Sequence, residues 1–364
     1  MTLPPSFLLN SGDQLYKYQL QARLGGGGFG DVWLAHDHSI SRDVAVKILA
    51  LNVTIDERLQ EARIGNHLDH QNLVKMHYAD IVQHNGVDVV IIAMDYHSNG
   101  SIMNGINACN FMPIPDVIRF MIDILRGLEY LHELNLYHSD IKPQNILIGT
   151  SNQGVLTDYG ISCHSPVGCT APHRGFYKLH AAPEVLQNGQ VSVQTDIYQV
   201  GLTTFRLLNG LGTIRDKFNS LGESDYYQLV QQGKVVQSAD YLPFIPRNLK
   251  SVINKAIHVN PTSRFQSALQ MRRALERLSY PGYWTCDSSG GFIGLIANNE
   301  FRFEEQPKVG RLFDFIAVKK NKFTGRETRI SKYSTKNVTR LQADEMNRDF
   351  MQWVVSGYLK LKTT

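Results

Sequence analysis

The first part of the chain alternates short apolar runs with turn sequences. Between Tyr16 and Met94 the runs YQLQARL, DVWLAHD and DVAVKILAL alternate apolar and polar positions, which is typical of strands. VDVVIIAMDY is continuously apolar, as expected of a buried strand. Residues 56–68, DERLQEARIGNHL, have a helical spacing instead. The pattern predicts a small, strand-rich unit with one helix.

After about Asn99 the apolar residues recur with the spacing of a helix. IPDVIRFMIDILRGLEYLHEL predicts a long amphipathic helix with Pro115 in its first turn. TDIYQVGLTTFRLLNG predicts a helix that is apolar on most sides, hence buried, and ended by Gly210. LKSVINKAIHVNPTSR and QSALQMRRALERL predict further helices. A larger helical unit therefore follows the strand-rich one, joined to it near Asp95–Gly100.

The last 80 or so residues form a separate pattern. SYPGYW is interpreted as a linker. FIGLI, EFRFEE and FDFIAVKK predict strands, and RETRISKYS completes a hairpin through NKFTG. LQADEMNRDFMQWVVSGYL predicts a closing amphipathic helix, with Phe350 and Trp353 on one face. We expect residues 281–364 to form a small α+β domain.

Composition narrows the class of protein. Hydrophobic residues make up 43% of the 364 positions and charged residues 19%, which favours a packed globular chain over a disordered one. Four cysteines are too few for a disulfide scaffold and indicate a reducing compartment. The start lacks a signal-peptide pattern, and no run reaches the ~18–20 apolar residues that cross a bilayer. We expect a soluble cytoplasmic protein that does not enter membranes.

The net charge of +4 is unevenly placed. Residues 1–299 hold 23 Lys and Arg against 25 Asp and Glu, whereas residues 300–364 hold 14 against 8. Residues 308–340 alone carry ten basic and two acidic residues. Two interpretations stay open: a solvated face of the small domain, or a docking surface for an acidic protein. Nucleic acid is the weaker partner, because no RNA-binding aromatic motif or zinc finger is visible.

Two features of the strand-rich unit fit the binding of a triphosphate. Gly25, Gly27 and Gly30 form G-x-G-x-F-G between two predicted strands, where a backbone without side chains folds closely over phosphates. Lys47 ends V-A-V-K on an apolar strand, where a buried ammonium needs a partner. Glu61 in the following helix is the expected partner, which leaves Lys47 to hold the α- and β-phosphates. Each feature alone is also typical of an ordinary hairpin or a surface lysine.

HSDIKPQN, residues 138–145, is the most specific segment. Asp140 can orient an acceptor hydroxyl and accept its proton, and Lys142 can neutralise a phosphoryl group in transfer. Asn145 offers an oxygen ligand for Mg²⁺, and Asp158 in LTDYG supplies a carboxylate that bridges the metal to phosphates. Singly these residues fit turns and surfaces. Together, in this order, they indicate phosphoryl transfer.

The chain at this point resembles a eukaryotic-like serine/threonine protein kinase over residues 16–279. The Gly-rich loop, V-A-V-K, H-x-D-x-K-x-x-N, D-Y-G, A-A-P-E and D-x-Y-x-x-G occur in the order of that family. The resemblance implies a bilobal α+β kinase fold, with an N-terminal extension over 1–15, an N-lobe over 16–97 and a C-lobe over 98–279. The extension over 281–364 is outside the resemblance.

The resemblance also implies roles for individual residues. It implies ATP with Mg²⁺ or Mn²⁺ as cofactor, and protein Ser/Thr hydroxyls as acceptors. It pairs Glu184 with Arg264 and makes Asp196 a brace for the catalytic loop. The residues that it implies at the nucleotide are Val32, Ala45, Met94 as gatekeeper, and Asp95 and His97 in the hinge.

Several positions depart from the pattern of the family. Ser139 replaces the Arg that meets a phosphate on the activation segment, so we expect activity without phosphorylation of that segment. Tyr159 adds a hydroxyl that needs a partner. Gly65 replaces a large apolar residue, which predicts loose packing of helix 56–68. Phe176 lies where Ser/Thr kinases usually place Thr. Gln144 replaces a Glu, which predicts no strong need for basic residues in the substrate.

Other functions were weighed against an active kinase. A pseudokinase would lack part of the set formed by Lys47, Glu61, Asp140, Lys142, Asn145 and Asp158, but all are present. Small-molecule phosphotransferases share H-x-D-x-x-x-x-N, but Lys142 and A-A-P-E favour a protein substrate. A metal or disulfide role for Cys163 and Cys169, beside His164 and His173, is a minor alternative to ordinary loop residues.

Overall fold

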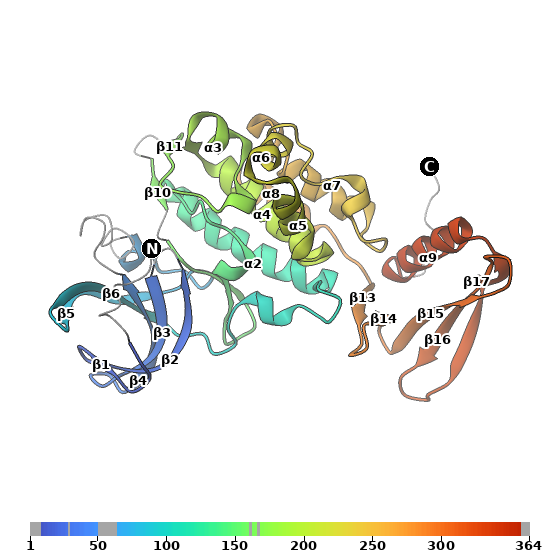
Figure 1. The fold of residues 1–364 in the computed structure, drawn as a ribbon, viewed down its shortest axis with the longest axis horizontal. Coiled ribbons are helices and arrows are strands. Elements are labelled where there is room, and N and C mark those ends of the chain that lie inside the picture. Colours follow the sequence, from blue (N-terminus) through green and yellow to red (C-terminus); the bar gives the residue numbers. More distant parts are fainter. Residues whose placement is uncertain (1–8, 28–29, 50–63, 160–161, 166–167, 358–364) are drawn as a thin grey trace. The chain divides into compact units, whose positions relative to one another are not determined.

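The computed structural model describes residues 9–27, 30–49, 64–159, 162–165 and 168–357 (Figure 1). Contacts divide the chain into two compact units. The first comprises Met1–Asn104, Asp123–Tyr177 and Gly189–Asp196; the second comprises Gly105–Ile122, Lys178–Asn188 and Ile197–Thr364. Most of the helix expected at 56–68, with Glu61, lies outside the described residues, and its described end at 64–66 is helical.

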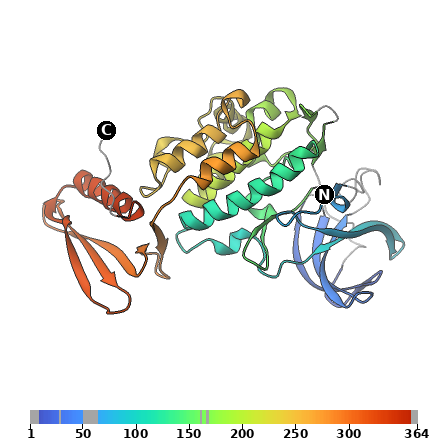
Figure 2. The ribbon, with the colours of Figure 1, turned by 180° about the vertical axis from the view of Figure 1, so that it is seen from behind.

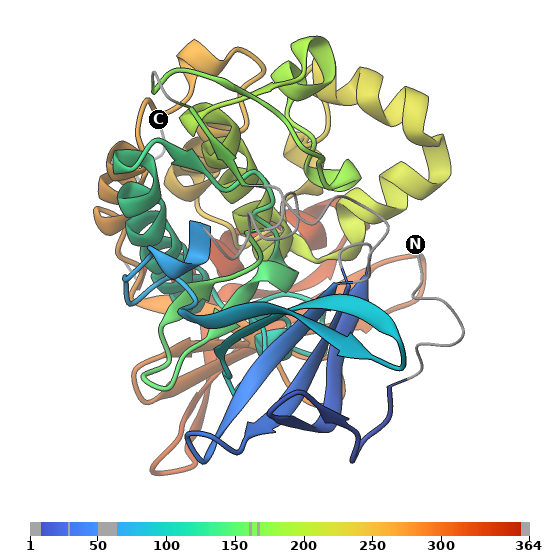
Figure 3. The same cartoon turned by 90° about the vertical axis from the view of Figure 1, so that its left-hand side faces the viewer.

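The strand-rich part of the first unit is an antiparallel sheet in the order β1-β2-β3-β4-β6-β5, seen in Figure 3 as a curled surface. Consecutive residues of a strand point to opposite faces. One face packs a core that includes Val44, Val46 and Ile48 of β4. The opposite face therefore presents Ala45 and Lys47. The strands are β1 Gln14–Leu15, β2 Tyr18–Gly27, β3 Gly30–Asp37, β4 Arg42–Leu49, β5 Met76–His84 and β6 Val87–Asp95.

Short strands and turns complete the first unit. β8 pairs with β9, β7 with β10, and β11 with β12, each antiparallel. They hold the loops that carry the motifs at 138–145 and 158. Their bounds are β7 Leu136–Tyr137, η2 Pro143–Asn145, β8 Ile146–Ile148, β9 Gly154–Leu156, β10 Cys163–His164, β11 Ala171–Pro172 and β12 Gln190–Val191.

Helices dominate the second unit, and α2 and α4 contribute residues to both units. Arg264 is fully buried and donates two hydrogen bonds to the Glu184 carboxylate, at 2.9 and 2.8 Å, which confirms the expected ion pair. The bounds are η1 Ile102–Gly105, α2 Ile114–Glu133, η3 Lys178–His180, α3 Pro183–Asn188, α4 Val193–Asn209, α5 Gly212–Leu221, α6 Glu223–Gln231, η4 Ser238–Asp240, α7 Arg247–Ala256, η5 Pro261–Ser263 and α8 Ala268–Glu276.

Residues 281–357, here called the C-terminal domain, belong to the second compact unit and form an antiparallel sheet in the order β13-β14-β15-β16-β17 with α9 packed on one face (Figure 2). The helix begins at a capping box formed by Thr339 and Gln342. The strands and helix are β13 Gly282–Cys286, β14 Phe292–Ile296, β15 Asn299–Pro307, β16 Phe313–Asn321, β17 Glu327–Val338 and α9 Arg340–Val355.

Aromatic side chains fill the space between this sheet and α9. Trp284 is fully buried, packs edge-on against Phe350 and donates its indole N–H to the Met351 carbonyl at 3.0 Å. Phe303 and Phe315 stack beside them. The interpretation of SYPGYW as a linker is therefore wrong at its end, because Gly282–Trp284 belong to β13 and supply a core residue.

A disulfide between Cys109 and Cys286 joins the segment before α2 to β13, with Cα atoms 6.1 Å apart. The cysteine count did not predict this bond. The reducing compartment indicated by the cysteine count does not fit this pair, whereas Cys163 and Cys169 form no disulfide. The spacing of the cysteines in the sequence did not indicate this bond, because 177 positions separate the two partners.

The packing around Gly65 corrects a third expectation. A Cβ atom at this position would lie 2.1 Å from the Met76 sulfur, so the Met76 side chain already occupies that space. Met76 itself is buried. The absent side chain of Gly65 is replaced by packing from β5, and the expected loss of packing there is wrong.

None of the helices in the described ranges combines the length and apolar character that crossing a bilayer requires.

Candidate active site

Lys47 and Asp158 form the ion pair at the centre of the site. Lys47 is 5% exposed, and its Nζ donates to Asp158 Oδ1 at 2.8 Å. Burial alone would raise the pKa of Asp158, but the adjacent Lys47 ammonium overcomes this effect and holds the pKa at about 2. Asp158 is therefore an anion at neutral pH, as a metal ligand must be. The partner expected from the sequence, Glu61, lies outside the described residues.

Asp140, Lys142 and Asn145 lie together on one loop. Asp140 Oδ2 accepts from Lys142 Nζ at 2.6 Å and from Asn145 Nδ2 at 2.9 Å. Its other oxygen, Oδ1, is shielded from solvent and has no hydrogen-bond partner among the described residues. Burial raises the pKa of Asp140, and Lys142 offsets this only in part. A raised pKa makes a carboxylate a better proton acceptor.

Asp196 of α4 holds the backbone of this loop in place. Its carboxylate is fully buried and accepts from the backbone N–H groups of His138 and Ser139 at 2.9 and 2.8 Å. His132 of α2 contacts the same carboxylate at 2.9 Å. Ser139 has a φ of 66°, a left-handed conformation that costs energy for a non-glycine residue. The two hydrogen bonds from Asp196 stabilise it, so the expected brace is confirmed.

His138 links the two loops of the site. Its Nε2 lies 3.1 Å from the Thr157 carbonyl, and its Nδ1 accepts from the Asp140 N–H at 3.3 Å. These contacts require a neutral ring that carries its proton on Nε2. Complete burial lowers the pKa of His138 and so favours this neutral form. The ring thus adds no charge between Asp140 and Asp158.

The strands place the expected nucleotide residues on one face. Val32 of β3 lies opposite Lys47 of β4, and Ala45 lies opposite Met94 of β6. Opposite residues of antiparallel strands share a face, so these four side chains lie on the face that the core does not use. Met94 and Ala45 are buried at 6% and 7% exposure.

The Gly-rich sequence forms a hairpin between β2 and β3, with Gly25 opposite Val32 and Gly27 opposite Gly30. Gly30 has a φ of 121°, and a Cβ there would lie 2.3 Å from the Ile48 carbonyl oxygen. Only glycine fits this position.

Asp95 is the last residue of β6, and His97 lies just after it. Asp95 contacts the His77 ring at 2.7 Å. Both ring nitrogens of His97 are shielded from solvent and lack a hydrogen-bond partner among the described residues. Burial lowers the pKa of His97, although Asp95 opposes the shift. A neutral ring with two unsatisfied nitrogens is suited to a polar ligand.

Asn145 and Asp158 fit a hard divalent cation. The Thr157 N–H donates to the Asn145 carbonyl at 3.0 Å, which ties the residue before Asp158 to Asn145. Because Asn145 Nδ2 is bonded to Asp140, its side-chain oxygen remains as the ligand atom. An amide oxygen and a carboxylate are ligands that Mg²⁺ prefers.

The described residues contain no cluster of three His, Cys, Asp or Glu, which leaves the minor zinc alternative at Cys163 and Cys169 without support.

Tyr159 finds a partner for its additional hydroxyl. The residue is buried, and its hydroxyl donates to the Leu156 carbonyl at 3.2 Å. The ring packs edge-on against His138. The hydroxyl that Tyr159 adds is therefore hydrogen-bonded.

Tyr177 is a site residue that the sequence did not indicate. Its ring lies under the Lys142 ammonium, 4.9 Å from the centroid, while Lys142 also bonds Asp140. Phe176, the aromatic residue singled out from the sequence, instead packs against His173. Spacing cannot tell which of two adjacent aromatic residues faces Lys142, because that depends on the path of the segment.

Replacing Lys47 should expose the electrostatic role of this ion pair. In Lys47→Met, burial acts on Asp158 without its main opposing charge, so the pKa should rise from about 2 to above the ordinary carboxyl value. In the wild type the pair stabilises the fold above the unfolded-state pKa of 3.8, and this stabilisation is lost as pH falls through about 2. Carboxyl-carbon NMR titration, assigned with Asp158→Asn, measures the shift.

The matched control is Lys75→Met, since Lys75 pairs with an exposed carboxylate, Asp69, at 3.2 Å. It should leave the titration of Asp158 unchanged. A pKa that stays near 2 in Lys47→Met would show that other groups ionise Asp158.

Comparison with known proteins places this geometry in a family. Residues 18–275 match the model of the protein kinase domain. The serine/threonine-protein kinase PrkC of Bacillus subtilis is 29% identical over 264 residues, which cover 70% of this chain and 39% of PrkC.

Two other relatives have a similar sequence identity and cover a similar share of the chain. The serine/threonine-protein kinase PknB of Mycobacterium leprae is 27% identical over 274 residues, 72% of this chain and 43% of PknB. PknJ of Mycobacterium tuberculosis is 28% identical over 285 residues, 75% of this chain and 47% of PknJ. The chain thus spans less than half the length of these relatives. The match over 18–275 covers most of the chain and agrees with the site described above, and the chain belongs to the protein kinase family.

Proposed function

We propose that this chain transfers the γ-phosphoryl group of ATP to Ser or Thr hydroxyls of protein substrates. The observation that carries the proposal is the state of Asp140. One carboxylate oxygen is fixed by Lys142 and Asn145, and the other is buried without a partner among the described residues. A buried, unsatisfied acceptor is costly unless a ligand donates to it. An acceptor hydroxyl is such a donor.

Each group then has a separate task. Asp140 orients the hydroxyl and takes its proton, and Lys142 neutralises charge on the phosphoryl group in transfer. Lys47 holds the α- and β-phosphates. Asn145 and Asp158 would hold Mg²⁺ or Mn²⁺, which supplies neutralising charge at the phosphates when bound. Positioning and charge account for most of the catalysis in this class of reaction.

The nucleotide would lie against the face of the sheet that presents Lys47. Val32, Ala45 and Met94 supply apolar contact on that face. Asp95 and His97 follow directly, and the two unsatisfied nitrogens of His97 support a contact with a base. Gly25, Gly27 and Gly30 cover the phosphates from the hairpin between β2 and β3.

The alternatives are less well supported. A pseudokinase would not need the pairing of Lys142 with Asp140, nor an ionised Asp158. A small-molecule phosphotransferase is disfavoured by the segment ending at A-A-P-E, whose Glu184 is fixed by Arg264. The similarity to the serine/threonine-protein kinases PrkC and PknB favours a protein acceptor.

Asp140→Asn should separate transfer from nucleotide binding. The change keeps the shape but removes the proton acceptor, so transfer from labelled ATP·Mg²⁺ to casein should fall about a hundredfold or more, equivalent to about 2.7 kcal/mol in the barrier. Thermal shift with ATP·Mg²⁺ should remain as in the wild type. Lys47→Met and Asp158→Ala should lose both activity and the shift.

Asp216→Asn is the matched control, since Asp216 lies on α5 with an exposed side chain. It should retain full activity. Near-normal turnover by Asp140→Asn would refute the assignment, and nucleotide binding by a wild type that transfers no phosphate would support the pseudokinase.

We further propose that transfer does not require phosphorylation of the activation segment. Ser139 is buried and uncharged, where the family pattern has an Arg that a phosphate compensates. Ser162 and Ser165 are also buried, and the Ser162 hydroxyl donates to the His138 carbonyl at 3.3 Å. The activation segment contains three Ser or Thr residues that could accept a phosphate, Ser162, Ser165 and Thr170. Of these three, Thr170 is the exposed one. A phosphate there would have no Arg at position 139 to bind.

Thr170→Ala should therefore keep activity within about threefold of the wild type, because position 139 carries no cation that a phosphate would neutralise. Phosphatase treatment of the wild type should have an equally small effect. The comparison is made at equal concentration on casein, with mass spectrometry of the segment. A hundredfold loss in Thr170→Ala, with an unchanged circular dichroism spectrum, would show that another cation replaces the missing Arg.

We also propose that the basic stretch of the C-terminal domain docks an acidic protein. Lys308, Lys322 and Arg340 are neutralised by carboxylates of the domain itself. Arg329 and Lys336 of β17 are exposed and have no acidic partner within 4 Å among the described residues. These unpaired cations remain available to an acidic partner.

Charge reversal tests this surface. Arg329→Glu/Lys336→Glu should weaken binding of polyglutamate at least tenfold at low salt, because it replaces attraction with repulsion. Arg273→Glu/Arg277→Glu is the control, because it changes the net charge by the same amount. Arg273 is an exposed residue of α8 and Arg277 directly follows that helix. This variant should bind polyglutamate almost as well as the wild type. Equal weakening in both variants would indicate net charge alone. Absence of binding by the wild type would leave the stretch as a solvated face.

A further inference from the structure

The Cys109–Cys286 disulfide connects two parts of the chain that the kinase-domain match separates. Cys109 lies within the matched residues 18–275, and Cys286 lies beyond them in the C-terminal domain. The backbone between α8 and β13 is short, since α8 ends at Glu276 and β13 begins at Gly282. The domain is thus attached by one short segment and by one covalent bond far away in sequence.

Ring contacts and hydrogen bonds lie beside the bond. Phe292 packs against Phe111 and Phe244, with ring centroids 6.0 and 6.2 Å apart. On the other side, Gln352 of α9 donates to the Pro243 and Ile245 carbonyls. Contacts of this extent hold the domain in place more weakly than a packed core does, so the disulfide has a large share in fixing its position.

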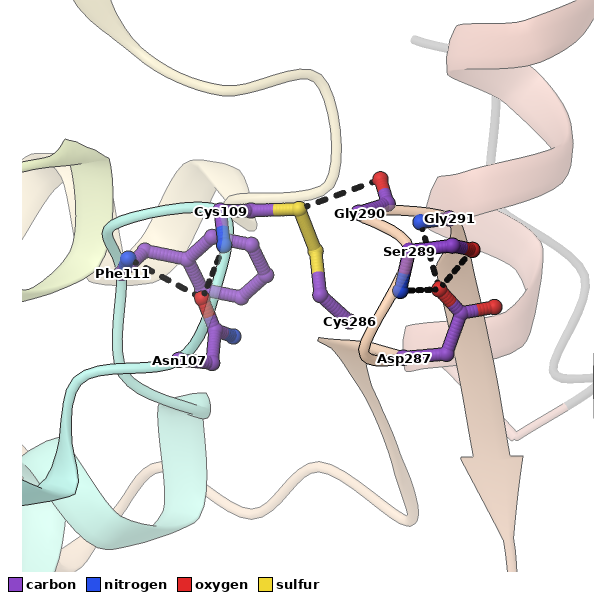
Figure 4. The surroundings of a disulfide bond; sticks show 8 residues. All are labelled: Asn107, Cys109, Phe111, Cys286, Asp287, Ser289, Gly290 and Gly291. Carbon is purple, nitrogen blue, oxygen red and sulfur yellow. Dashed lines mark hydrogen bonds between the residues drawn. A yellow bond between two sulfur atoms is a disulfide. The ribbon is translucent and has the colours of Figure 1, made fainter.

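Cys109 lies on a loop and Cys286 is the last residue of β13, and side-chain hydrogen bonds support the backbone next to each of them (Figure 4). On the first loop, Asn107 Oδ1 accepts from the backbone N–H groups of Cys109 and Phe111 at 3.1 and 3.2 Å. Breaking the bond therefore leaves the backbone around Cys109 supported.

The second loop is supported in the same way. Asp287 Oδ1 accepts from the N–H groups of Ser289 and Gly291 at 3.0 and 2.8 Å, and from the Ser289 hydroxyl (Figure 4). The turn after Cys286 is thus preformed. Opening or closing the disulfide needs no local refolding on either side.

The bond is also accessible, and its reduced form has a partner. Cys109 and Cys286 are both partly exposed, and the exposed residues Ala108 and Asn110 flank Cys109. The Cys109 sulfur lies 3.3 Å from the Gly290 carbonyl oxygen. A sulfur in a disulfide has no proton to donate, but a Cys109 thiol would find this acceptor in place.

We propose that Cys109 and Cys286 form a redox-controlled clamp, which fixes the C-terminal domain to the loop before α2 when oxidised and releases it when a dithiol reduces the bond. A thiolate of the dithiol attacks one sulfur and the other cysteine leaves as a thiolate. The second thiolate of the reductant then resolves the mixed disulfide. Two electrons and two protons pass to Cys109 and Cys286, and the reductant becomes a disulfide.

The clamp goes beyond the proposed phosphoryl transfer and does not depend on it. It controls whether the exposed basic residues of β17 are held at a fixed position or move with a tethered domain. Binding of a partner to the domain would then differ between the two redox states, with no change in the residues that bind ATP.

The first experiment establishes the bond. The full chain is purified without reductant, alkylated and digested, and the linked Cys109–Cys286 peptide is sought by mass spectrometry. We expect that peptide, with Cys163 and Cys169 alkylated as free thiols. Alkylation of Cys109 and Cys286 in the untreated protein would overturn the proposal.

Hydrogen exchange then tests the release. Reduction by dithiothreitol and the variant Cys286→Ser should each speed exchange at least fivefold in peptides from 106–113 and 282–296, with α2 unchanged. Reoxidation by a small disulfide should restore protection in the wild type only. The matched control is Cys169→Ser, which removes an exposed cysteine that forms no disulfide and should behave as the wild type.

Two outcomes would overturn the clamp. Exchange that stays within twofold after reduction would show that the apolar contacts suffice to hold the domain. Faster exchange throughout α2 and the C-terminal sheet would show that the bond stabilises the whole fold instead. If Cys286→Ser does not fold, the reduced and reoxidised wild type still decides between these results.

Discussion

The carboxylate of Asp196 is the constraint on which the candidate site depends. It is fully buried and is stabilised by two backbone N–H groups of the catalytic loop and by His132. A buried carboxylate without these donors would be strongly unfavourable. The same hydrogen bonds hold Ser139 in a left-handed conformation, and this conformation sets the direction in which Asp140 leaves the loop. The position of Asp140 thus follows from the charge of a residue 56 positions later in the chain.

Opposing electrostatic effects give the two acidic groups of the site different properties. Burial raises the pKa of Asp140, because Lys142 compensates for it only in part. At Asp158 the adjacent Lys47 outweighs burial, and the pKa is about 2. The His138 ring is neutral, so it adds no charge that would reduce the difference in pKa between Asp140 and Asp158. One carboxylate is therefore suited to accept a proton and the other to bind a metal.

In the C-terminal domain, the interactions that form the core differ from those that fix its position. Its own core is aromatic and built around Trp284 and Phe350, whereas its contacts with the helices near it include ring contacts, the hydrogen bonds of Gln352 and a disulfide. A domain with a complete core does not need such a contact in order to fold. The disulfide and the rings fix where it lies, which is the property that a change of redox state would alter.

Local sequence determined much of this protein. The strand alternation around Lys47, the helix over Ile114–Glu133 and the closing helix over Arg340–Val355 follow from periods that side-chain burial imposes. The order of Lys47, Asp140, Lys142, Asn145 and Asp158 predicted that these residues belong to one site. It did not predict that Lys47 contacts Asp158, because the expected partner was Glu61, which lies outside the described residues.

Tertiary structure alone decided the remainder. Neither spacing nor composition predicts that Cys109 meets Cys286, that Tyr177 rather than Phe176 contacts Lys142, or that Met76 fills the space beside Gly65. The start of β13 was missed for a similar reason, since Trp284 acquires its core role only when α9 packs over it. Periodicity encodes which face of an element is buried, but the partner on that face is chosen by packing between segments far apart in the chain.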